Sequence, residues 1–282
     1  MNVISNTIAT RSSQSLGLGG FLRRARRAIA SINPHRVIAR VVVRLLPRWP
    51  YPVLRGPLRG CRFILGALAG EAGGVSVHLG ILEVDQVECL TQTLQRGRIF
   101  FDVGANVGFY SLLGSKLVGR DGAVVAFEPM PRNLGFLFRH TRLNKTRNVI
   151  IVPLACADEI STELFVEGEN NALGRLGGHD FDLTSADAQT LVVATISLDA
   201  AAEKLGLRPD VIKIDVEGAE LRVLKGAKSI LTQARPSVLL SVHSAELRDA
   251  CLAYLDALQY QSQPLNARSI ELATEFFAKP AG

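Results

Sequence analysis

Acidic residues and glycines follow two apolar runs near the middle of the chain. Residues 99–113 read IFFDVGANVGFYSLL, in which an apolar run breaks at Asp102 into a turn with Gly104 and Gly108 and then resumes with helical spacing. The next apolar run, AVVAFEP, contains Glu128 at its end. A strand that passes through a glycine-spaced turn into a helix is typical of a nucleotide site. Two acids at adjacent strand tips could hold a ligand with an ammonium group and a ribose, as S-adenosylmethionine (SAM) has.

The glycines of this turn have separate expected roles. Gly104 can adopt a positive φ and lets the backbone approach a ligand, while a side chain at Gly108 would push the helix away from the strand. Asn106 falls at the expected helix start, whose free amide groups suit a carboxylate. The pattern reads DxGxNxG and not the GxGxxG of dinucleotide sites, which favours SAM over NAD. An ordinary strand, turn and helix without a ligand is the alternative.

Alternating strands and helices must position these residues. Hydrophobic periodicity predicts strands at 148–158, 235–244, 260–264 and 268–272, helices at 131–144 and 245–258, and a strand followed by a helix at 211–227. Residues 55–66 are expected to form a turn and then a strand, and residues 78–95 a turn and then a helix. This alternation implies an α/β fold with a doubly wound, mostly parallel sheet and with ligands outside the carboxyl ends of the strands. A less regular insert, residues 159–197, would select the substrate. In the helix at 131–144, the residues expected to face the sheet are Leu134, Leu137, Phe138 and Leu143.

Positive charge is concentrated at the N-terminus. Residues 1–70 contain twelve Arg and no Asp, Glu or Lys, whereas the whole chain has a formal net charge of +6. We therefore divide the chain near residue 70, into a basic N-terminal arm with the region that leads into the sheet and a catalytic domain over residues 71–282. The four cysteines are dispersed without a CxxC pair, so neither a disulfide framework nor a zinc site is indicated, and a reducing, cytoplasmic location is expected.

Residues 21–51 of the arm alternate arginines with Ile, Val and Leu. Arg36, Arg40 and Arg44 would form one charged stripe on a helix, which could lie on an anionic membrane surface. The apolar runs are far shorter than the ~20 residues of a spanning helix, and no signal-peptide core is recognised. Packing on its own domain and an organellar transit peptide are the alternatives. Nucleic-acid binding is not expected because aromatic residues are few, and the oligomeric state is not indicated.

Three segments carry a resemblance to a known family. DVGANVGFYSLL, AFEPMPRNLGFLFRH and VIKIDVEGAELRVLKGA, in this order and at these separations, resemble the FkbM family of SAM-dependent methyltransferases from about residue 55 to 262. The resemblance implies a seven-stranded class I methyltransferase fold. It also implies SAM as cofactor and methyl transfer to a hydroxyl oxygen of a sugar, glycan or polyketide-like small molecule.

The resemblance assigns cofactor roles by position. The residues that would line the methionine part of the cofactor are Asp102, Gly104, Asn106 and Gly108. Glu128 would take the ribose hydroxyls, and Asp158 with its neighbours would contact the adenine edge. The family usually has an aromatic residue before the acid at Glu83, where this chain has Leu82, so a cofactor role for Glu83 is left open.

Attack of a neutral hydroxyl on a sulfonium methyl needs alignment, exclusion of water and removal of the hydroxyl proton. Asp215 ends the fourth parallel strand and is the first choice as general base; its alternatives are a helix cap or a partner for the cofactor ammonium. His243, at the tip of the following strand, is the second choice, with a structural hydrogen bond as its alternative. Lys213 faces the same side of the strand as Asp215, where an ion pair with a neighbouring acid is the alternative role.

Other acids lie close to this strand tip. Glu217 and Glu220 fall in the first turn of a helix, where acids are favourable without catalysis. Asp215, Glu217 and His243 could together bind a divalent ion that polarises the acceptor oxygen, although no motif requires it and no metal is expected. The leading hypothesis is therefore a SAM-dependent O-methyltransferase. A nicotinamide oxidoreductase and a non-catalytic binding module of the same fold are the alternatives.

Overall fold

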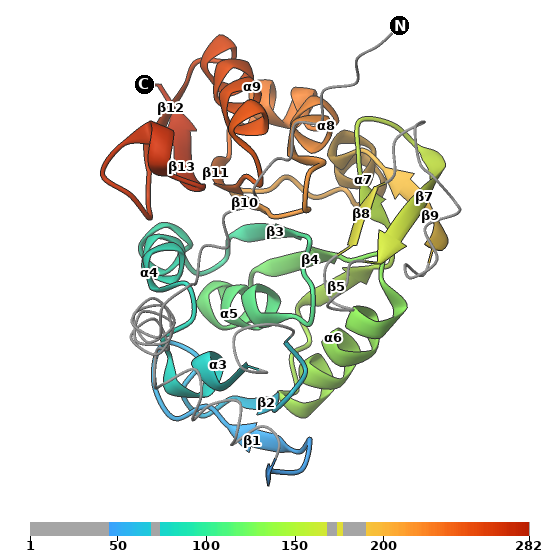
Figure 1. Ribbon diagram of the computed structural model, residues 1–282, viewed down its shortest axis with the longest axis vertical. Coiled ribbons are helices and arrows are strands. Elements are labelled where there is room, and N and C mark those ends of the chain that lie inside the picture. The colour runs from blue at the N-terminus through green and yellow to red at the C-terminus, as the bar shows by residue number, and fades with distance from the viewer. Residues whose placement is uncertain (1–44, 69–73, 168–173, 177–189, 282) are drawn as a thin grey trace, which may run out of the picture.

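A seven-stranded sheet forms the centre of the protein (Figure 1). The computed structural model describes residues 45–68, 74–167, 174–176 and 190–281. The strands lie in the order β12 (Tyr260–Pro264), β13 (Glu275–Pro280), β11 (Ser237–Ser241), β10 (Val211–Ile214), β3 (Ile99–Val103), β4 (Ala123–Phe127) and β5 (Val149–Val152). All neighbours from β11 to β5 pair in parallel, and β13 runs antiparallel to both β11 and β12. The expected doubly wound, mostly parallel sheet is confirmed.

Helices cover both faces of this sheet because its central strands are apolar on both sides. On one face, Phe101 packs with side chains from α7 (Leu198–Leu205), α8 (Glu220–Lys225) and α9 (Ala245–Ala257). Phe100, which precedes Phe101 on β3, points to the other face and packs with α4 (Val84–Thr93) and α5 (Phe109–Val118). The two helical layers are visible above and below the sheet in Figure 1.

The expected strand at 148–158 is divided between two sheets, which corrects the sequence analysis. Residues Val149–Val152 form β5, whereas β6 (Ala155–Cys156) pairs in parallel with β9 (Thr190–Ile196). Pro153 lies between them and has no N–H with which to continue a ladder. The insert completes this second sheet with β7 (Ser161–Glu167) and β8 (Gly174–Leu176), in the order β6-β9-β7-β8. The second sheet therefore begins directly at the end of a core strand.

Two further expectations are wrong in detail. Residues expected as a strand at 268–272 contain a short 3₁₀ helix, Ile270–Leu272, and the final strand is β13. Leu272 is exposed, while Phe276 and Ala278 alternate into the core, so the buried pattern begins later in the chain. On α6 (Pro131–Leu143), Leu137 is buried but Phe138 is 49% exposed, because Phe138 lies outside the narrow stripe that contacts the sheet.

The region before the sheet packs into the same core as the catalytic domain. Strand β1 (Pro50–Pro52) pairs antiparallel with β2 (Arg62–Ile64), and α3 (Val75–Leu79) follows. Val53 and Phe63 share a hydrophobic cluster with Leu112 of α5, across the expected boundary near residue 70. The part of the expected membrane-binding helix before Leu45 lies outside the described residues. Among the described residues, no helix has the length and apolar character to cross a membrane.

A buried histidine joins this N-terminal region to α6. The ring of His140 accepts the backbone N–H of Ile64 at Nε2 (2.9 Å), and its Nδ1 lies 2.7 Å from the carbonyl oxygen of Val107, to which it donates. Phe63 stacks on the ring with a centroid distance of 4.0 Å. Burial lowers the pKa of His140 to about 4. The neutral ring therefore fastens β2 and the turn after β3 to one helix.

This arrangement predicts a pH-dependent stability. The unfolded chain binds a proton at His140 below its ordinary pKa of 6.5, whereas the folded protein does not until about pH 4. The contribution is fully present above pH 6.5, and about 3 kcal/mol is lost as the pH falls to 4. His140→Gln, which keeps a donor and an acceptor, should flatten this part of the curve of unfolding free energy against pH. Parallel curves for the two proteins would contradict the assignment.

Candidate active site

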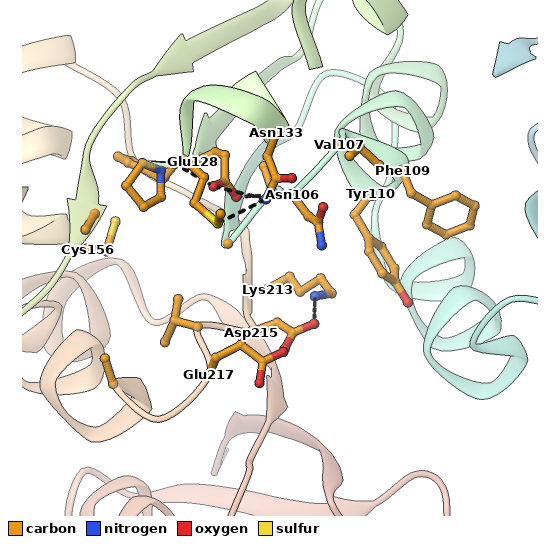
Figure 2. A pocket seen from close by; sticks show the side chains of 18 of the residues that line it. Asn106, Val107, Phe109, Tyr110, Glu128, Asn133, Cys156, Lys213, Asp215 and Glu217 are labelled. Carbon is orange, nitrogen blue, oxygen red and sulfur yellow. Dashed lines mark hydrogen bonds and ion pairs between the residues drawn. The ribbon is translucent and has the colours of Figure 1, made fainter. Parts of the chain in front are cut away.

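A cavity opens at the carboxyl ends of β3, β4 and β10 (Figure 2). This is the edge at which ligands bind in open parallel sheets. Figure 2 shows Glu128, Asn106 and Asn133 on one side of the cavity and Lys213, Asp215 and Glu217 on the other. Residues from the ends of β3 and β4 therefore face residues from the end of β10 across one cavity.

The turn after β3 brings backbone against the cavity. Gly104 has a φ of +81°, and a Cβ on it would collide with the backbone carbonyl oxygen of Asp215. Asn106 and Gly108 also have positive φ, and α5 begins at Phe109. Asn106 thus lies before the helix, which corrects the expected helix start. Its backbone N–H is not free, because it donates to the carboxylate of Glu128 (2.8 Å).

Glu128 forms part of the cavity wall and is only 4% exposed. Its two carboxylate oxygens accept the backbone N–H groups of Asn106 and Met130, each at 2.8 Å, and Asn133 Nδ2 lies at 3.4 Å. Burial raises the pKa of Glu128 to about 7, although these three donors oppose the shift. The local hydrogen bonds hold the carboxylate in place at the end of β4, where it can accept from hydroxyl groups of a ligand.

Asp102 is fully buried and, like Gly108, is not among the residues that line the cavity, although both were expected along the methionine part of the cofactor. The hydroxyl of Ser111 donates to Oδ2 (2.6 Å), while Oδ1 has no hydrogen-bond partner among the described residues. Burial raises the pKa of Asp102 to about 6. A buried acceptor without a partner is costly, and a cationic or N–H-bearing ligand group above it would relieve that cost.

Lys213 lies between the carboxylates at the ends of β3 and β10. It pairs in register with Asp102 on β3, so both side chains point to the same face of the sheet. Its ammonium group lies 2.9 Å from Asp215 and 4.5 Å from the centre of the Tyr110 ring. Burial opposes the charge of Lys213, but the carboxylates of Asp215, Glu83 and Asp102 outweigh burial and raise its pKa. The cation therefore stays charged inside the protein.

Glu83 is brought into the cavity, a role that the sequence left open. The hydroxyl of Tyr110 donates to Glu83 Oε2 (2.7 Å), and both residues line the cavity. Glu83 has a φ of +41°, an uncommon backbone conformation for a glutamate. Leu82 replaces the aromatic residue of the family pattern and lines the same cavity. Tyr110 was not identified from the sequence, although it occurs in the DVGANVGFY segment.

A second group of polar side chains surrounds His243. Its Nδ1 is 2.7 Å from Glu220 Oε1, and its Nε2 is 3.2 Å from Glu217 and 3.6 Å from Asp215. Burial opposes a positive charge on the ring, but the hydrogen bond to Glu220 and the neighbouring carboxylates outweigh it and raise the pKa of His243. Ligand atoms of Asp215, Glu217 and His243 lie within 4.8 Å of one another, so these three could hold a metal ion.

Asp158, expected at the adenine edge, is not brought into this cavity. Its carboxylate is half exposed and pairs with Arg222 Nη2 (2.7 Å), which also contacts Glu163 of β7 (2.6 Å). Cys156, two residues earlier on β6, lines the cavity instead. The sequence also missed Met130 and Asn133, which the PMPRN segment after Glu128 places on the wall.

The residues present fit SAM. Glu128 offers fixed acceptors for two ribose hydroxyls, and the unpartnered oxygen of buried Asp102 suits the region of the ammonium group. Strand order, cavity position and donor set together define a class I SAM-dependent methyltransferase.

Comparison with known proteins agrees with this class. The Methyltransferase FkbM domain matches residues 102–262, and the chain belongs to this family. It is 28% identical over 163 residues to the hexuronic acid methyltransferase AglP of Haloferax volcanii, a match that spans 57% of this chain and 63% of the relative. The expected family is thereby confirmed, and the matched region is a methyltransferase domain of the class that uses SAM.

Solved structures with a similar arrangement are more distant. The methyltransferase FkbM from Methylobacillus flagellatus has a TM-score of 0.46 at 18% identity, covering 76% of this chain and 56% of that one. The fibrillarin of Aeropyrum pernix, solved with bound SAM, has a TM-score of 0.43 at 12% identity, covering 69% and 73%.

The two acids assigned to the nucleoside can be separated by substitution. Glu128→Gln removes a charged acceptor from the cavity wall and should weaken SAM binding about tenfold or more, because charge-assisted hydrogen bonds are worth ~1.5–3 kcal/mol. Asp158→Asn removes the same charge outside the cavity and should leave the dissociation constant within about twofold. Isothermal titration of both variants provides the measurement. A large loss with Asp158→Asn and none with Glu128→Gln would reverse the assignment.

Proposed function

We propose that the protein transfers the methyl group of SAM to a hydroxyl oxygen of a sugar or glycan. The observation that carries the proposal is the polar group at the end of β10, which lines the cavity opposite Glu128 and contacts His243 at the end of β11. A hydroxyl nucleophile needs a proton acceptor at that point. The similarity to a protein named as a hexuronic acid methyltransferase supports a sugar as the acceptor.

Bound SAM supplies an electrophilic methyl group on a sulfonium sulfur. The carboxylate of Asp215 lines the cavity and is oriented by Lys213 (2.9 Å), which holds the pKa of Asp215 below its usual value against the effect of burial. A carboxylate with a lowered pKa is a good hydrogen-bond acceptor for a hydroxyl group, but it is a weak base. Asp215 therefore orients the acceptor hydroxyl, and Lys213 is a positioning residue.

His243 is the better final proton acceptor. In the neutral ring, with Nδ1 donating to the buried carboxylate of Glu220, Nε2 carries the lone pair and faces Asp215 and Glu217. As the acceptor oxygen bonds to the methyl carbon and the carbon–sulfur bond breaks, the hydroxyl proton passes to Nε2. The order of preference from the sequence, Asp215 before His243, is thus revised in this proposal to a shared role.

The acceptor and the base can be tested together. Incubation with isotopically labelled SAM and oligosaccharides that contain hexuronic acid should yield a product with one labelled methyl group, read by mass spectrometry. A hexuronic acid offers both hydroxyl and carboxylate oxygens, and a methyl ether resists alkali whereas a methyl ester is hydrolysed. An alkali-labile product would contradict transfer to a hydroxyl.

Asp215→Asn and His243→Gln should each lower kcat by about 10²–10⁴-fold, because the first misplaces the acceptor hydroxyl and the second removes the proton acceptor. The dissociation constant for SAM should stay within about threefold, since neither side chain is assigned to the cofactor. Glu246→Gln, an exposed acid at the start of α9, serves as a control with full activity. Unchanged kcat in both active-site variants would remove this proton route.

Chelation separates the proton route from a metal route through the same side chains. Direct proton transfer to His243 predicts that dialysis against EDTA leaves kcat unchanged. Loss of activity that is restored by added Mg²⁺ would instead place a divalent ion among Asp215, Glu217 and His243.

A further inference from the structure

Two neighbouring segments of the folded part of the chain, residues 45–68 and residues 129–157, contain basic residues and no acidic ones. The two lie side by side, because the backbone N–H of Arg62 on β2 donates to the side chain of Asn144 (2.7 Å), and Asn144 Nδ2 donates back to the Arg62 carbonyl (2.8 Å). The positive charge of the protein is thus not confined to the N-terminal arm, and it continues onto a surface of the catalytic domain.

Exposed cations surround two hollows on this surface. The first hollow is lined by Pro50, Ile64, Arg139, Arg142 and Leu143. The second hollow shares the end of α6 and is lined by five cations, Arg59, Lys116, Arg120, Lys145 and Arg147. We call the seven arginines and lysines of the two hollows the basic face. Within the part of the chain that the structure describes, none of them forms an ion pair with a carboxylate.

Apolar side chains accompany these charges. Leu45 is 77% exposed and Trp49 is 64% exposed, and both lie just before Pro50 of the first hollow. Phe138, 49% exposed, directly precedes Arg139 on α6. Large exposed apolar side chains among unpaired cations fit an interface that is both anionic and hydrophobic.

We propose that the basic face docks the catalytic domain onto a membrane that contains anionic lipids. Residues 1–44 are not its electrostatic partner, because they carry eight Arg and no acid and are repelled by the same charge. Instead they add to the attraction for an anionic surface. Nucleic acid fits less well, since among the described residues no aromatic side chain on which a base could stack lines either hollow.

Docking through this face leaves the active site accessible. Arg120 and Arg147 shortly precede β4 and β5, so the second hollow lies at the amino ends of these strands. The cavity lies at their carboxyl ends. A membrane-bound protein would therefore keep the mouth of the cavity away from the lipid surface.

The test compares two full-length variants of equal charge. One has Arg139→Gln, Arg142→Gln, Lys145→Gln and Arg147→Gln on the basic face. The matched control has Lys204→Gln, Arg208→Gln, Lys228→Gln and Arg268→Gln, all exposed and outside that face. Sedimentation with vesicles of phosphatidylcholine and phosphatidylserine measures partitioning, and pure phosphatidylcholine vesicles measure its dependence on anionic lipid. Thermal unfolding with and without SAM shows that both variants fold.

Trp49 is the one tryptophan in the sequence, so its fluorescence reports whether this part of the protein contacts the membrane. Wild type and control should bind anionic vesicles, with a blue shift of the Trp49 emission as it enters the interface. The basic-face variant should bind at least tenfold more weakly, since each basic residue near such a surface contributes roughly fivefold.

Equal partitioning of the basic-face variant and the control would overturn the proposal, because the arm or the net charge would then account for binding. Binding without a shift of the Trp49 emission would also overturn it. Binding of a labelled single-stranded RNA is measured for the same proteins. Loss of RNA binding in the basic-face variant, with vesicle binding unchanged, would make this surface a nucleic-acid site instead.

Discussion

A buried cation at the sheet edge is the interaction on which the active site depends. Lys213 is 2% exposed, and its charge is balanced by Asp215 at 2.9 Å and by Asp102, its register partner on β3. Burying an ion in this way costs several kcal/mol unless partners compensate, and removal of one partner leaves an uncompensated charge. The side chain therefore ties the ends of β3 and β10 together electrostatically. Asp215 is held in a fixed position as a consequence.

Close backbone contact at the same edge limits which residues the turn can contain. The carbonyl of Asp215 occupies the space that a Cβ of Gly104 would need, so any other residue would separate β3 from β10. The turn then continues through Asn106, whose backbone N–H donates to Glu128 on β4. Three adjacent strands are thus connected through one short turn.

Much of this could be predicted from the sequence. Apolar runs that end in Asp102, Glu128 and Asp215 placed three acids at the edge of a parallel sheet, because strand ends of such a sheet coincide. The prediction of a SAM-binding turn came from the local pattern DxGxNxG alone. The basic N-terminal region was visible in composition, whereas its continuation onto α6 was hidden, since it requires β2 and α6 to be neighbours.

The contacts that the sequence did not reveal have a common physical cause. Asp158, expected at the adenine edge, forms an ion pair with Arg222, which is distant in sequence. The contact between Tyr110 and Glu83 likewise joins separate segments, and no periodicity encodes it. Side-chain pairing across the fold decides such positions. Pattern in the sequence fixes which face of an element a residue occupies and leaves its partner undetermined.

The central claim is that carboxylates at the ends of β3 and β4 define the cofactor site. A crystal structure of the protein with S-adenosylhomocysteine tests it most directly. The account predicts both ribose hydroxyls within hydrogen-bond distance of Glu128, and the amino-acid part of the ligand beside the Gly104 turn above Asp102. A nucleoside bound away from Glu128, or on another edge of the sheet, would contradict it.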